Sequence, residues 1–74
     1  MNFDKELDAR GLACPMPIVK TKKTLASMES GQILKVVSTD PGSVADMKAF
    51  AEATGHDLLS QEAQGSEYCF YLKN

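Results

Sequence analysis

The sequence predicts a two-layer α/β domain with the element order βαβαββ, in which both helices pack on one side of a sheet. Two observations carry this prediction. Two kinds of segment alternate along the chain. Strand-like segments are rich in β-branched or alternating apolar residues, and helix-like segments have apolar residues every three or four positions. Parallel strands need long crossover connections, and these are right-handed, which puts both helices on the same face.

The first predicted strand and the first predicted helix flank a short turn. Lys5 to Ala9 alternates apolar with charged residues, as a half-buried strand does, and Arg10-Gly11 turns the chain. A helix is expected to begin at Pro15 or Pro17, and to run to about Glu29. Its buried stripe is predicted to contain Ile18, Thr21, Leu25 and Met28, broadened by Val19 and Ala26.

The middle of the chain predicts an interior strand followed by a second helix. Gly31 is expected to close the first helix as a left-handed cap. Ile33 to Ser38 is nearly continuously apolar and β-branched, which is typical of a strand with neighbours on both sides. Asp40 is the expected cap of the second helix, with Pro41 as its first residue, although Ser43 is an alternative cap.

The second helix is predicted to run to Thr54 and to end at Gly55. Two strands then follow, at Asp57 to Glu62 and at Glu67 to Lys73, joined by a hairpin turn near Gly65. The side chains expected to face the core are Val44, Met47, Ala51 and Thr54 in the helix, flanked by Phe50, and Tyr68, Phe70 and Leu72 in the last strand.

Size and composition limit the classes of function. With 74 residues we expect one domain, spanning residues 1–74, with little room for an enclosed active site. A net charge of −2 gives no general attraction to nucleic acid or to an anionic membrane. The first six residues lack the apolar stretch of a signal peptide, and two cysteines in such a chain indicate a reducing compartment, which we take to be the cytoplasm.

The stretch from Arg10 to Pro17 is the candidate functional site, because it sets Cys14 between a strand and a proline-rich helix start. A cysteine at or beside a helix N-cap faces the positive end of the helix dipole, which favours the nucleophilic thiolate. Pro15 and Pro17 remove backbone donors, so we expect only a modest fall in the pKa of the thiol. The same prolines stiffen the backbone around it.

Taken together, Leu7 to Leu12, Cys14-Pro15-Met16-Pro17 and Thr39 to Ser43 resemble the TusA-like (SirA-like) family of sulfur carriers over essentially the whole chain. The family's motif is cysteine, proline, any residue, proline. The resemblance implies a mixed four-stranded sheet whose last strand is antiparallel to the rest. It also implies that Cys14 takes up sulfane sulfur as a persulfide, with Pro15, Pro17, Arg10 and Gly11 as supporting motif residues.

The same resemblance implies the partners. They are a sulfur donor, such as a cysteine desulfurase or a rhodanese-like protein, and an acceptor protein with a reactive cysteine. Family members serve tRNA thiolation, sulfur supply for molybdenum cofactor, or sulfur oxidation. The protein is then a relay of sulfurtransferase type more than a stand-alone turnover enzyme, without cofactor or metal, and with no direct contact to nucleic acid or membrane.

Several residues near the motif have both a functional and a structural interpretation. Arg10 is the nearest cation in the sequence and either stabilises the thiolate or is a solvated surface charge. Lys20 and Lys23 either recognise acidic partners or form an ordinary solvated helix face. Met16 either belongs to an apolar docking patch or fills a gap in the core.

Two alternative classes of function remain open at this point. In a thiol–disulfide redox module, Cys69 resolves mixed disulfides on Cys14, which requires the two Cα atoms to approach within about 7 Å. The alternating pattern of the last strand instead places Cys69 on the open face of the sheet or at its edge. In a pure interaction module, Cys14 has no chemical role. His56 has no spaced Cys or His partner for a metal site.

Overall fold

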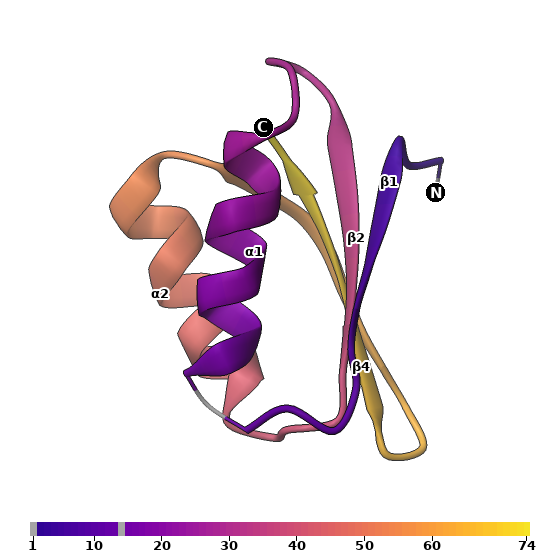
Figure 1. Ribbon diagram of the computed structural model, residues 1–74. Helices are drawn as coiled ribbons and strands as arrows, with labels where there is room; N and C mark the ends of the chain where they lie inside the picture. The colour runs from indigo at the N-terminus through magenta and orange to yellow at the C-terminus, as the bar shows by residue number, and fades with distance from the viewer. Residues whose placement is uncertain (1, 14) are drawn as a thin grey trace.

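The computed structural model describes residues 2–13 and 15–74, and its elements follow the predicted order. Two helices lie against one face of a four-stranded sheet and leave the other face open (Figure 1). The elements are β1 (Lys5–Ala9), α1 (Met16–Ala26), β2 (Ile33–Ser38), α2 (Ser43–Thr54), β3 (Asp57–Gln64) and β4 (Glu67–Lys73).

The sheet is mixed, with the spatial order β1-β2-β4-β3. Strands β1 and β2 are parallel, with Ala9 opposite Ser38, whereas β4 is antiparallel to both β2 and β3. The last strand therefore runs against the other three, as the family resemblance implies. The predicted interior position of β2 is also confirmed, because β1 and β4 flank it.

The core lies between the sheet and the helices. On the sheet side, Leu34 and Val36 alternate with residues of the open face, and Phe70 and Leu72 do the same in β4. Tyr68 packs against this core from the end of β4, as predicted. The buried residues of the cluster are Ala9, Leu25, Leu34, Val36, Met47, Phe50, Ala51, Phe70 and Leu72.

Three predicted core positions are wrong. Val19 is 49% exposed and Ala26 is exposed, because α1 turns Pro17, Thr21 and Leu25 toward the sheet. A residue two positions after Pro17 is rotated by about 200° around the helix, so Val19 points to solvent. Thr54 is also exposed at the end of α2, where its hydroxyl donates a hydrogen bond to the carbonyl of Phe50.

Helix α1 ends at Ala26, three residues before the predicted end. The side-chain amide of Asn74 donates hydrogen bonds to the carbonyls of Leu25 and Met28, both at 2.9 Å, and to that of Glu29 at 3.3 Å. It thereby satisfies acceptors that the end of a helix leaves unpaired. Gly31 does adopt a left-handed conformation, with φ of +88°, but it lies in the turn beyond the helix.

The other boundaries are close to the predictions. Gly55 ends α2 in the left-handed conformation. Helix α2 starts at Ser43 with Gly42 at the N-cap position, so both predicted caps, Asp40 and Ser43, are wrong. The Asp40 carboxylate instead accepts a hydrogen bond from the N–H of Gly42 in the turn before the helix. Strand β3 extends two residues beyond the predicted end, to Gln64, and contains an irregularity between Leu58 and Ser60.

Candidate functional site

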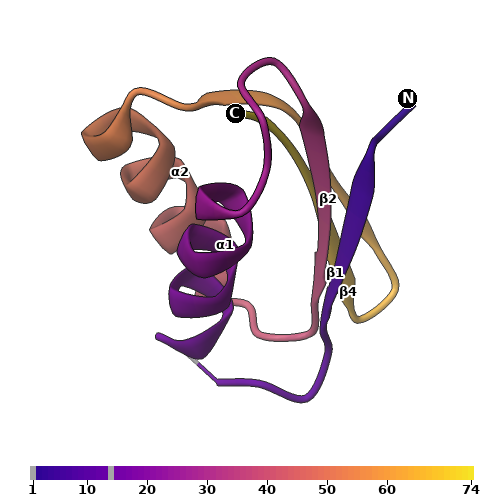
Figure 2. The same ribbon diagram turned by 45° about the horizontal axis from the view of Figure 1, so that its top comes forward.

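Helix α1 begins at Met16, between the two starts that the prolines predict, with Pro15 at the N-cap position. Among the described residues, no side chain caps the N-terminus of this helix. Cys14 itself lies outside the described residues, so its place at or beside the cap stays a prediction. In the sequence it directly precedes Pro15. Figure 2 shows that α1 and α2 both start at the same end of the sheet.

The two prolines of the motif lie in different environments. Pro15 is exposed, whereas Pro17 is fully buried in the core. The carbonyl of Pro17 accepts a hydrogen bond of 2.7 Å from the hydroxyl of Thr21, which is buried as well. Met16, between the prolines, is 42% exposed. The motif is therefore anchored at its second proline and presents Pro15 and Met16 to solvent.

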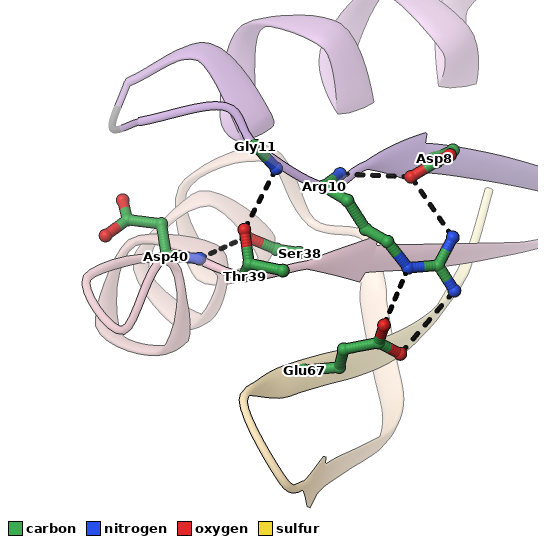
Figure 3. Close-up of polar contacts among 7 residues, drawn as sticks. All are labelled: Asp8, Arg10, Gly11, Ser38, Thr39, Asp40 and Glu67. Carbon is green, nitrogen blue, oxygen red and sulfur yellow. Dashed lines mark hydrogen bonds and ion pairs between the residues drawn. The ribbon is translucent and has the colours of Figure 1, made fainter.

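Arg10 points away from α1, toward the start of β4 (Figure 3). Its Nε donates a hydrogen bond to Oε2 of Glu67 at 2.9 Å, and its Nη1 lies 3.3 Å from Oδ1 of Asp8. The carboxylate of Glu67 raises the pKa of the Arg10 guanidinium further above its ordinary value. Because the Arg10 guanidinium already pairs with two carboxylates, it serves better to link the motif loop, residues 10–15 between β1 and α1, to β4 than to pair with a thiolate.

Gly11 forms a second link, to the end of β2. With φ of +78°, Gly11 has a left-handed backbone, and its N–H donates a hydrogen bond of 2.9 Å to Oγ1 of Thr39. Sequence reasoning assigned no separate role to Thr39. The available signal was topological, because β1 and β2 are parallel and the residues that follow them leave the sheet side by side.

Two grooves flank α1, and two of the predicted docking residues, Lys20 and Lys23, line the same one. Lys20 and Lys23 are exposed and, with Leu7, line a shallow groove between α1 and β1. Pro15 borders a second, more apolar groove on the side of α2, which Ile18 and Phe50 also line. Both grooves adjoin the helix that follows the motif, so positive charge and apolar surface are available on opposite sides of it.

Cys69 lies on the open face of the sheet, as the alternating pattern of β4 predicts. Its side chain is half-buried in a small hollow that Arg10, Lys35, Glu62 and Tyr71 also line. Helix α1 covers the other face, so the sheet separates Cys69 from the helix that follows the motif (Figure 1). This placement argues against Cys69 as a resolving thiol and so against the redox alternative.

The same hollow gives Tyr71 a predictable response to pH. Burial raises the pKa of the Tyr71 phenol above its ordinary value, and Cys69 and Glu62 raise it further. Above about pH 10 the unfolded chain then loses this proton more readily than the folded chain, so the free energy of unfolding falls as pH rises. Urea unfolding from about pH 9 to about pH 11 should show a shallower fall in Tyr71→Phe than in the wild type. Parallel curves would contradict this assignment.

Residues 2–13 and 15–74 contain neither a cluster of metal ligands nor a helix that could span a membrane. In that part of the chain, no three His, Cys, Asp or Glu side chains gather as metal ligands would. No helix there has the length and apolarity that crossing a bilayer requires. The ring of His56, the one histidine in the sequence, stacks on Phe50 with centroids 5.7 Å apart.

Comparison with known proteins identifies relatives over almost the whole chain. The chain is 53% identical over 72 residues to a sulfur carrier protein TusA from Allochromatium vinosum, and the alignment covers 97% of this chain and 95% of the relative. It is 52% identical over 73 residues to the putative sulfur carrier protein YrkI from Bacillus subtilis, and this alignment covers 99% of this chain and 97% of the relative. A crystal structure of a SirA-like protein from Desulfitobacterium hafniense superposes with a TM-score of 0.83 at 25% identity, over 95% and 96% of the two chains.

The family model described as Sulfurtransferase TusA matches residues 5–74, which include every strand and helix of the fold. Together with relatives that are more than half identical, this match shows that the chain belongs to the TusA family.

Proposed function

We propose that this protein is a sulfur carrier that accepts sulfane sulfur as a persulfide on Cys14 and relays it to acceptor proteins. The observation that carries the proposal is membership of the TusA family over residues 5–74, with close relatives named sulfur carrier proteins. The exposure of Ala13, Pro15 and Met16 around Cys14 supports it, because a carrier must offer its sulfur to other proteins.

The proposed chemistry is a pair of thiol exchange steps. The Cys14 thiolate attacks the outer sulfur of a donor persulfide. A new S–S bond forms at Cys14, the S–S bond of the donor breaks, and the donor leaves as a thiolate. An acceptor thiolate then attacks the outer sulfur on Cys14, which regenerates the Cys14 thiolate. One sulfur atom moves in each step without net oxidation, so no cofactor takes part, and the sulfur itself is the cargo.

The proposed partners are proteins that supply or receive this sulfur. The donor is a cysteine desulfurase or a rhodanese-like protein, and the acceptor carries its own reactive cysteine. Met16 offers an apolar contact beside the motif, and Lys20 and Lys23 offer positive charge to acidic partner surfaces. The chain would act in the cytoplasm as a single carrier domain, in tRNA thiolation, in molybdenum cofactor sulfur supply or in sulfur oxidation.

The direct test is mass spectrometry of the protein after incubation with a cysteine desulfurase and cysteine. We expect one additional sulfur atom, mapped by peptide analysis to Cys14 and removed by a thiol reductant. The chain contains two cysteines, so Cys69 is the internal control for non-specific sulfuration. A wild-type protein that gains no sulfur, or gains it equally on both cysteines, would overturn the proposal.

A further inference from the structure

We propose that Thr39 is a positioning residue for sulfur transfer, because its hydroxyl holds the backbone of the loop that leads to Cys14. The inference rests on the proposed function, since it assumes that Cys14 is the reacting residue. It concerns the hydrogen bond between the Gly11 N–H and Oγ1 of Thr39, 2.9 Å long (Figure 3).

This hydrogen bond fixes the backbone of the loop to Thr39, the residue that follows β2. The neighbouring amides bond locally, since the N–H of Arg10 donates to Oδ1 of Asp8 and the N–H of Leu12 donates to the carbonyl of Ala9. These bonds shape the turn but do not attach it to another element. Of the backbone amides of residues 10–12, that of Gly11 bonds to a segment 28 positions away.

The acceptor stands on a well-fixed part of the chain. Thr39 follows Ser38, which is fully buried and whose Oγ accepts a hydrogen bond from the N–H of Asp40. The carbonyl of Asp40 in turn accepts hydrogen bonds from both the N–H and the hydroxyl of Ser43, the first residue of α2. The Thr39 hydroxyl is therefore placed by β2 on one side and by the start of α2 on the other.

The donor is fixed as well, by the conformation of Gly11. A φ of +78° is one that residues with a Cβ rarely adopt, and the N–H of the same residue donates the hydrogen bond to Thr39. The side chain of the preceding residue, Arg10, binds Glu67 at the start of β4. The loop is therefore held at two successive residues. The side chain of Arg10 binds β4, and the backbone N–H of Gly11 binds Thr39 at the end of β2.

Loss of this hydrogen bond should affect transfer more than stability. Thr39 is half-buried and Gly11 is exposed, so water can replace a lost partner, and a typical intramolecular hydrogen bond has a modest net effect on folding. Sulfur exchange, in contrast, requires the attacking sulfur and the leaving sulfur to be aligned, and small misplacements of a reacting group reduce rates strongly.

The test compares Thr39→Val, which removes the hydroxyl but keeps the branched shape, with Thr39→Ser, which keeps a hydroxyl. Both are made in a Cys69→Ser background, so that Cys14 is the only thiol. The rate of sulfur loading from a charged cysteine desulfurase is measured against carrier concentration. We expect Thr39→Val to lower the maximal rate by about tenfold to a hundredfold with the half-saturating concentration unchanged. Thr39→Ser should restore most of the rate.

Two further readouts separate positioning from simple packing. The pH profile of Cys14 alkylation should change in Thr39→Val, and urea unfolding should show nearly equal stability in the two variants. An unchanged maximal rate in Thr39→Val, or an equal loss in Thr39→Ser, would overturn the inference. These results are distinct from failure of the proposed function, in which the Cys69→Ser parent would itself accept no sulfur.

Discussion

Replacing Cys14 with serine is expected to abolish persulfide formation and sulfur transfer completely. Serine has nearly the same size, but its hydroxyl is not ionised near neutral pH and does not form a persulfide, so no sulfur can be held at this position. The measurement is transfer of radiolabelled sulfur from cysteine, through a desulfurase, to the variant and then to an acceptor protein. Circular dichroism and urea unfolding show whether the variant is folded.

Cys69→Ser is the matched control for this experiment. The Cys69 thiol is half-buried on the open face of the sheet, away from the helices, so its loss should leave sulfur loading near the wild-type level. Equal loss of transfer in both variants would instead favour a redox pair. A Cys14→Ser protein that keeps full activity with its partners would favour a pure interaction module, in which Cys14 has no chemical role.

The elements that the sequence predicts well are those determined by neighbouring residues. Strand β2 has the predicted bounds, because it is nearly continuously apolar and contains the β-branched residues Ile33, Val36 and Val37. Helix α2 ends where Gly55 supplies a left-handed cap. The layer arrangement follows from the same local information, since crossover handedness leaves one choice for the helices.

The predictions that failed or were missed depend on contacts between distant residues. The early end of α1 involves Asn74, whose amide reaches the carbonyl of Leu25, 49 positions away. Arg10 pairs with Glu67, 57 positions away, and no sequence pattern near the motif predicts this pair. The link from Gly11 to Thr39 depends on the register of two parallel strands. The supports of the motif loop therefore become visible only in the folded chain.

The stability of this scaffold should depend most on the aromatic side chain at the centre of β4. Phe70 is 1% exposed, and its strand pairs with β2 on one side and β3 on the other, with Phe70 opposite Val36 and Gln61. Truncation to alanine removes its transfer free energy and leaves a cavity, because a close-packed core relaxes only partly. We expect Phe70→Ala to lower the free energy of unfolding by about 3–5 kcal/mol.

Phe3→Ala is the matched control, because the same atoms are removed from a partly exposed position. Phe3 is 41% exposed, with its ring centroid 6.3 Å from that of Tyr71 and 5.2 Å from the ammonium nitrogen of Lys35. Its loss should cost about 1 kcal/mol or less. Urea unfolding of both variants measures the difference. A domain of this size has a small free energy of unfolding, so Phe70→Ala should be largely unfolded at 37 °C while Phe3→Ala stays folded. Equal effects of the two substitutions would show that the core is not centred on β4.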